Sequence, residues 1–314
     1  RHVHRGATSQ DAIDTGAVLQ MRRALALVEA GVARIGTALA RQARAHARTV
    51  MAGRTWTQQA LPITFGLKLA GWLDAMTRHR CRIAAAQEQI SVLQFGGAAG
   101  TLASLGTRGL DVAAALAREL RLALPALPWH GQRDRIAETG AALALLAGTL
   151  GKMARDISLL MQTEVGEVLE PAAPGKGGSS TLPHKRNPVG SAAVLAAAIR
   201  VPALAATLFT AIVQEHERGL GGWHAEWETL PEIFDLTAGA LSHMAEMIEG
   251  MEVRPERMRA NLEATQGLLL AEYSERAAGQ SYWVADRRAY TMNEVISAIE
   301  SVLERDFKVR CARK

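Results

Sequence analysis

The clearest capacity for chemistry lies in residues 171–188, PAAPGKGGSSTLPHKRNP. Glycines such as Gly177 and Gly178 let a backbone approach a ligand closely and turn its N–H groups toward one point. The segment also carries hydroxyls and positive charges, supplied by Ser179, Ser180, Thr181, Lys176, Lys185 and Arg186. This combination predicts a long functional loop that binds an anion, although composition leaves a flexible basic linker open.

A second polar cluster precedes a helical pattern and consists of His4, Thr8, Ser9 and Asp11. Amides and hydroxyls at a helix N-terminus can hold a carboxylate. The alternative is simple helix capping, with the helix starting at Asp14 or Thr15. His2 and His4 have no third ligand at a zinc-like spacing, so we expect no metal site.

Residues 53–64, GRTWTQQALPIT, form a third polar stretch. Thr57 and Gln58 place neutral hydrogen-bonding groups ahead of Pro62, where a helix can begin, so we expect a polar helix entrance. The glycine-rich residues 95–109 either approach a ligand or break a long helix.

The elements that must position these groups are long helices. Apolar residues at alternating steps of three and four predict three bundle helices, the first over about residues 15–50 and about 50 Å long. The stripes are Val18, Met21, Leu25, Val28, Val32, Ile35 and Leu39; Leu69, Trp72, Met76, His79, Ile83, Ala86, Ile90 and Leu93; and Leu143, Leu146, Leu150, Met153, Ile157 and Leu160. We interpret all of them, His79 included, as core residues.

Residues 189–213 are rich in alanine and apolar on most faces, which favours a helix at the centre of a bundle or an oligomer. A further helix is expected over residues 231–250, and a capping box at residues 291–294 suggests a helical tail. The predicted fold is all-α, a long-helix bundle. Residues 1–14 are expected to end an N-terminal domain, 15–250 to form the bundle and 251–314 a small helical region.

The composition is that of a globular protein: 314 residues, 48% hydrophobic and 21% charged. The net charge is +5, but Lys and Arg are scattered along the helices, so we expect no nucleic-acid partner. Cys81 and Cys311 form no disulfide framework, which favours a reducing cytoplasm. We recognise no signal peptide and no apolar run of 18 residues, and so expect no membrane partner.

Residues 178–188, GSSTLPHKRNP, resemble the signature of the fumarase/aspartase superfamily, GSSxMPxKxN, with Leu182 at the methionine position. HRGATSQDAIDT and GRTWTQQALPITFG resemble its first and second shared regions, and the likeness covers roughly residues 1–272. The resemblance implies a homotetramer built on a central helix bundle. It also implies active sites assembled from three regions on three different subunits.

Within the superfamily, two departures argue against adenylosuccinate lyase: Trp56 replaces its catalytic histidine, and Ala192 replaces its glutamate. The chain looks most similar to 3-carboxy-cis,cis-muconate cycloisomerases, which share the ATSQDxIDTG, GRTWTQQALPITFG and HERxxGGWxAEW forms. Arg5 stands where that branch has a tryptophan. The resemblance implies a cofactor-independent enzyme of the bacterial protocatechuate branch of the β-ketoadipate pathway, which closes a lactone from a small polycarboxylate.

The same resemblance implies a role for each candidate residue. Ser179 would transfer a proton, Lys185 would stabilise negative charge, and His4 would act as an acid, a base or a charge stabiliser. Thr8, Ser9, Thr57, Gln58, Ser180 and Asn187 would hold substrate carboxylates. The group at residues 216–218 is interpreted as an exposed turn or subunit contact, or as one that reaches a carboxylate.

Two other functions stay open at this point. One is a fumarate-releasing lyase of the same superfamily. The other is a helical oligomer that keeps the fold without the chemistry.

Overall fold

The computed structural model describes residues 4–172, 176–179, 181–182 and 185–264, and the backbone of residues 283–284 and 289–290. Ser180 and the predicted capping box at residues 291–294 lie outside the described residues. The helices are α1 (Ser9–Ala45), α2 (Phe65–Ile90), α3 (Gly109–Leu120), α4 (Asp134–Leu160), α5 (Val189–Thr210), α6 (Gly222–Gly250) and α7 (Pro255–Glu263), with a 3₁₀ turn at Ala103–Arg108. The strands are β1 (Val50–Thr55), β2 (Gln58–Thr64), β3 (Val168–Leu169), β4 (Glu252–Val253), β5 (Trp283–Val284) and β6 (Ala289–Tyr290).

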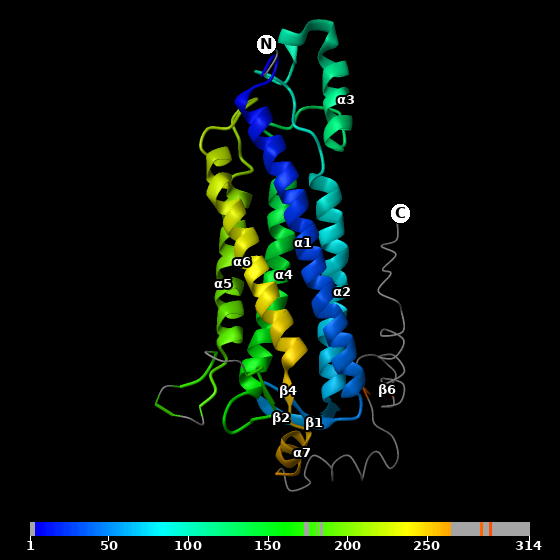
Figure 1. Ribbon diagram of the computed structural model, residues 1–314, viewed down its shortest axis with the longest axis vertical. Coiled ribbons are helices and arrows are strands. Elements are labelled where there is room, and N and C mark those ends of the chain that lie inside the picture. The colour runs from blue at the N-terminus through cyan, green and yellow to red at the C-terminus, as the bar shows by residue number, and fades with distance from the viewer. Residues whose placement is uncertain are drawn as a thin grey trace. The chain divides into compact units, whose positions relative to one another are not determined.

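Except for Leu93, which follows α2, the predicted apolar stripes lie on the long helices α1, α2 and α4, which Figure 1 shows as ribbons. Every residue of the three stripes is buried, including His79, which is 3% exposed. The long-helix prediction is therefore confirmed, although α1 begins and ends earlier than expected. Helix α6 also begins earlier, at Gly222, and carries Pro231 inside it rather than at its start.

The chain divides into two compact units. Unit 1 comprises residues 1–32, 79–148 and 196–241. In it, parts of α1, α4, α5 and α6 pack closely: a Cβ at Gly31 would meet Leu241, and one at Gly140 would lie 2.5 Å from Leu208. Small residues thus let neighbouring helices approach one another here.

Unit 2 comprises residues 33–78, 149–195 and 242–314. It contains the antiparallel β1–β2 hairpin, the antiparallel β3–β4 pair and α7. A Cβ at Gly66 would lie 2.6 Å from the carbonyl oxygen of Ala43, so the end of α1 and the start of α2 come together where only glycine fits.

The hairpin corrects the prediction of a polar helix entrance over residues 53–64. Pro62 lies inside β2, opposite Ala52, and α2 begins only at Phe65. Polar residues ahead of a proline do resemble a helix start, but here Pro62 sits in a two-stranded ladder with a bulge between Ala52 and Arg54. Proline is tolerated in such an irregular edge position.

Helix α5 bears on the expectation that no apolar run could cross a membrane. It is long and apolar enough to do so by length and composition, with a mean hydropathy of 1.9, although Arg200 interrupts its apolar residues. A core helix of a globular protein passes the same test, yet only 28% of this window is buried. Ile199 and Phe209, for example, are 74% and 52% exposed. This helix therefore presents an apolar surface that a single chain does not cover.

Candidate functional site

The first predicted region lies in unit 1, at the start of α1. The backbone N–H of Thr8 donates to Asp11 Oδ2 at 2.9 Å, which is half of a capping box. The capping that the alternative expected is therefore observed, but the helix starts at Ser9 and not at Asp14 or Thr15. His4 is exposed and has a left-handed φ of 64°, and the side chain of Ser9 is exposed as well.

Asp11 is the centre of a buried network that supports this region. Its Oδ1 lies 2.7 Å from His130 Nε2 and accepts from the amide of Gly96, while Oδ2 accepts from the amide of Gly97, both at 2.9 Å. Burial raises the pKa of Asp11, but the hydrogen bonds from His130 and the backbone amides outweigh it and hold the pKa below its ordinary value. The glycine-rich residues 95–109 thus approach a carboxylate of the protein itself.

Arg218 brings positive charge to the same region. Its Nη1 donates to Thr8 Oγ1 at 2.7 Å, and its Nη2 donates to the carbonyls of Gly97 and Ala98 at 3.0 and 2.7 Å. All three acceptors belong to the protein, so Arg218 joins the 216–218 group to the first region within unit 1. That one residue of this group reaches a substrate carboxylate stays a prediction.

The second predicted region forms the tip of the hairpin in unit 2. Thr55 pairs with Gln58, which leaves Trp56 and Thr57 as a two-residue turn with φ values of 51° and 64°. Such a turn strongly prefers asparagine and glycine, and bulky or β-branched residues are strained in it. Trp56 is also 97% exposed. Strain of this kind is concentrated at functional sites.

The hairpin is anchored close to its tip through Arg54. Its guanidinium forms a two-point contact with the fully buried Glu167, at 2.7 and 2.9 Å, and Asn261 Nδ2 donates to the same carboxylate at 2.8 Å. A pocket of 510 Å³ lies beside this contact, lined by Arg54, Thr57, Gln58, Gln59, Glu164, Val165 and Asn261. The predicted binding residues Thr57 and Gln58 therefore do line a polar pocket.

In the signature loop, also in unit 2, the Ser179 hydroxyl accepts hydrogen bonds from backbone N–H groups. Ser179 Oγ accepts from the amides of Leu182 at 3.0 Å and Thr181 at 3.3 Å. Two amides directed at one oxygen would stabilise that oxygen as an anion. Lys185 is exposed in the same loop.

The two ends of the loop are held together at Gly177. The amide of Asn187 donates to the carbonyl of Gly177 at 2.7 Å, and Gly178 forms a bridge with Arg186. Gly177 has φ +70°, and a Cβ there would lie 2.7 Å from the carbonyl oxygen of Asn187, so this close approach requires glycine. A pocket of 230 Å³ at this base is lined by groups that include Asn187, Lys176, His243 and Glu246.

The predicted site residues are thus divided between the units. His4, Thr8 and Ser9 belong to unit 1, whereas Thr57, Gln58, Ser179, Lys185 and Asn187 belong to unit 2. Within the described part of unit 2, no hydrogen bond links the side chains of the hairpin tip with those of the loop. The structure therefore positions one cluster in unit 1 and two in unit 2.

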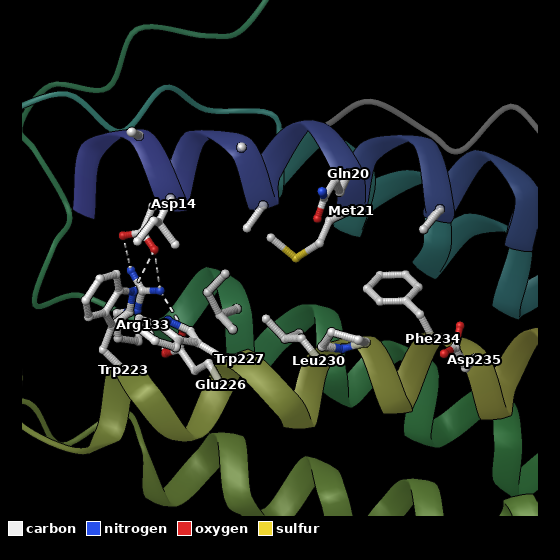
Figure 2. A pocket seen from close by; sticks show the side chains of 17 residues that line it. Asp14, Gln20, Met21, Arg133, Trp223, Glu226, Trp227, Leu230, Phe234 and Asp235 are labelled. Atoms are coloured by element: carbon white, nitrogen blue, oxygen red, sulfur yellow. Dashed lines mark hydrogen bonds and ion pairs between the residues drawn. The ribbon is translucent and has the colours of Figure 1, made fainter. Parts of the chain in front are cut away.

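Sequence reasoning missed a buried charged cluster in unit 1, shown in Figure 2. Arg133 donates to both oxygens of Asp14, at 2.8 and 3.1 Å, and to Glu226, while the Trp223 indole N–H donates to Asp14 at 2.9 Å. Burial lowers the pKa of Arg133, but the two carboxylates raise it by more, so the net shift is upward. Burial raises the pKa of Glu226, and the contact with Arg133 offsets only part of that rise. The signal was present as Asp11 and Asp14 on one face of α1.

A pocket of 520 Å³ adjoins this cluster. Apart from the charged groups, its lining is mainly apolar and includes Met21, Ile136, Trp227, Leu230 and Phe234 (Figure 2). None of the predicted site residues lines it. It is therefore a feature of the α1, α4 and α6 packing and not of the three predicted regions.

Residues 1–203 match a family described as lyase. The chain belongs to this lyase family. Over 272 residues it is 62% identical to the 3-carboxy-cis,cis-muconate cycloisomerase of Pseudomonas aeruginosa, covering 87% of this chain and 59% of that one. It is 49% identical over 279 residues to the nitrosuccinate lyase of Streptomyces davaonensis, covering 86% and 59%.

Among solved structures, the 3-carboxy-cis,cis-muconate lactonizing enzyme from Pseudomonas putida is similar to this chain with a TM-score of 0.84 and 54% identity. The match covers 97% of this chain and 66% of that one. The resemblance to the fumarase/aspartase superfamily and the all-α long-helix fold are thereby confirmed. The chain spans about three fifths of the length of the curated relatives it matches.

Proposed function

We propose that this lyase-family chain is part of a cycloisomerase that converts 3-carboxy-cis,cis-muconate to a carboxymuconolactone. The observation that carries the proposal is the 62% identity to a relative of that name, together with a signature loop that retains Ser179, Lys185 and Asn187. Trp56 at the hairpin tip fits this reaction better than adenylosuccinate cleavage, because an indole N–H only donates a hydrogen bond and cannot act as an acid or base.

The reaction is an isomerisation, so it requires proton transfer but no co-reactant. A substrate carboxylate oxygen adds to a carbon of the diene and forms the C–O bond of the lactone. The displaced π electrons collect on the carbon beside another carboxylate, and that carbon takes a proton from Ser179 Oγ. The two amides that contact Ser179 Oγ support this role, since they would stabilise the alkoxide until solvent restores the proton.

Positive charge is needed where the enolate-like intermediate develops. We assign this role to Lys185, with Asn187 as a donor to the same carboxylate. Thr8, Ser9, Thr57, Gln58 and Ser180 would hold the other carboxylates, and Arg218 would add charge beside Thr8. His4 remains a candidate acid, base or charge stabiliser. The proposed chemistry needs neither a cofactor nor a metal.

We also propose that the protein assembles as a homotetramer with active sites shared between subunits. One observation supports this: helix α5 exposes apolar residues that need a partner surface. We propose a cytoplasmic location and a role in aromatic catabolism for the same enzyme.

The test is the ultraviolet absorbance of 3-carboxy-cis,cis-muconate mixed with purified protein, alongside Ser179→Ala. Loss of the conjugated diene signal with the wild-type protein only is the expected result. If a tetrameric wild-type protein leaves the signal unchanged, the cycloisomerase proposal is wrong. Release of fumarate from a succinyl compound, or of nitrite from nitrosuccinate, would then assign a lyase activity instead.

A further inference from the structure

Residues 167–170, Glu-Val-Leu-Glu, contact two of the three candidate regions. Strand β3 (Val168–Leu169) lies between two buried carboxylates, Glu167 and Glu170, which are 0% and 6% exposed. We propose that these are positioning residues: Glu167 fixes the hairpin that carries Thr57 and Gln58, and Glu170 fixes the end of the signature loop that carries Asn187. The link to catalysis rests on the proposed function, but the positioning itself does not.

The argument for Glu170 begins at the start of α5. The carbonyl of Pro188 accepts from the amide of Ala192, so Pro188 is the N-cap residue. N-cap side chains usually accept from the second or third helical amide, and proline has no acceptor to offer. Glu170 takes this place from outside the helix, because its carboxylate accepts from the amides of Gly190 at 2.9 Å and Ser191 at 2.7 Å.

The Glu170 carboxylate also contacts a side chain at the start of α5, and the approach is close. Ser191 Oγ donates to the same carboxylate at 2.7 Å. A Cβ at Gly190 would lie 3.1 Å from Glu170 Oε2 and 2.8 Å from Met247 Sδ, so glycine allows the helix to approach the carboxylate. A negative charge at a helix N-terminus is also favoured by the helix dipole.

The backbone of Glu170 holds the other side of Asn187. The carbonyl of Glu170 accepts from Arg186 Nη2, and Arg186 Nη1 donates to Glu252 at 2.7 Å. Glu252 belongs to β4 and is paired with Leu169 of β3. Asn187 therefore lies between two groups that the same residue fixes: Arg186 before it and the first turn of α5 after it.

Glu167 plays the equivalent part for the hairpin. The two-point contact with Arg54 holds a residue that lies immediately before the strained turn, since Thr55 pairs with Gln58 across it. Glu167 is itself fixed through its backbone, whose amide donates to the carbonyl of Leu160 at 2.9 Å and whose carbonyl accepts from the amide of Arg254 at 3.0 Å. Residues 167–170 therefore have little freedom to shift, and each carboxylate can hold its partners in place.

Hydrogen–deuterium exchange tests positioning without any assumption about the reaction. Glu170→Gln replaces one carboxylate oxygen by an amide that faces N–H and O–H donors, so we expect peptides over residues 186–192 to exchange about tenfold faster while residues 50–60 keep their wild-type rate. Glu167→Gln should instead accelerate exchange over residues 50–60 and leave residues 186–192 at their wild-type rate. Glu88→Gln removes an exposed charge and serves as the control for charge.

Leu150→Ala supplies the control for stability, because Leu150 is fully buried in α4. It should lower the melting temperature without either local pattern. If Glu170→Gln and Glu167→Gln accelerate exchange evenly across the chain, as a globally destabilised protein does, the proposal is wrong. It is equally wrong if the two peptides stay within twofold of wild type in variants that remain folded.

Kinetics adds the link to function. If the wild-type protein lactonises, Glu170→Gln should lower kcat/KM about tenfold, since a displaced Asn187 donates less well to the carboxylate beside which the enolate-like charge develops. Leu150→Ala should leave kcat/KM unchanged at a temperature where it is folded. If the wild-type protein does not lactonise, the proposed function fails and the exchange patterns decide the positioning by themselves.

Discussion

The first region and the signature loop are supported in similar ways but present their functional groups differently. Asp11 holds the first region through backbone amides, as Glu170 holds the end of the loop. At the first region, however, Thr8 Oγ1 is already bound by Arg218, whereas the hydrogen bonds of Ser179 Oγ to described residues come only from the amides of its own turn. This difference suggests that the first region recognises charge and the loop carries the proton transfer.

The largest expected effect is that of Ser179→Ala on turnover. Removal of the hydroxyl removes the proton donor, so kcat should fall at least about a hundredfold, equivalent to about 2.7 kcal/mol or more in the barrier. KM should change little, because other groups hold the carboxylates. Steady-state kinetics on the tetrameric protein measures this, and Ser158→Ala in α4 is the matched control; a normal kcat in Ser179→Ala would contradict the role of the loop.

Arg218→Gln should act on recognition instead. The variant keeps a hydrogen-bonding group near Thr8 but loses the positive charge, so kcat/KM should fall about 10- to 100-fold, chiefly through KM. The fall in kcat/KM should be smaller at high salt, because salt screens the attraction between Arg218 and the substrate in the wild-type protein. A fall in kcat at constant KM would break the distinction between the two regions.

Asp11→Asn should lower stability in a pH-dependent manner. The folded-state pKa of Asp11 lies below its ordinary value of 3.8, so the carboxylate stabilises the fold above that value and the stabilisation is lost as pH falls through the lower folded pKa. The variant places an amide against three N–H donors, which should cost about 1–3 kcal/mol at neutral pH. Urea unfolding at pH 7 and pH 3 measures the difference in free energy of unfolding between the wild-type protein and Asp11→Asn, and this difference should be smaller at pH 3. An equal difference at both pH values would contradict a lowered folded-state pKa of Asp11.

The smallest expected effect concerns the hairpin tip, where stability and binding should move in opposite directions. Thr57→Gly relieves a positive φ and should stabilise the protein by about 0.4–1 kcal/mol, while loss of the hydroxyl raises KM. Thr57→Ala is the matched comparison, since it removes the hydroxyl but keeps the strained Cβ. Thermal unfolding should separate the two variants; equal melting temperatures would show that the turn holds no strain.

The sequence predicted the long helices well because their apolar stripes depend on local periodicity. It also located the signature loop, the first region and the hairpin segment, since those motifs are contiguous. The hairpin itself was missed, because a polar run before Pro62 favours a helix start locally, whereas Arg54 is fixed by Glu167, 113 residues away. Similarly, the buried pairs of Asp11 with His130 and Arg133 with Asp14 join residues 119 apart.

The central claim, a lactonising site that combines the first region of one copy with the loop of another, is tested most directly by mixing two variants that are each impaired at low substrate concentration. Ser179→Ala and Arg218→Gln would be unfolded together, refolded into tetramers and assayed by loss of diene absorbance at low substrate concentration. If sites are shared, some sites in mixed tetramers receive both intact groups, and activity should rise well above the sum of the separate variants. Activity equal to that sum, in tetramers shown to be mixed, would contradict the shared site.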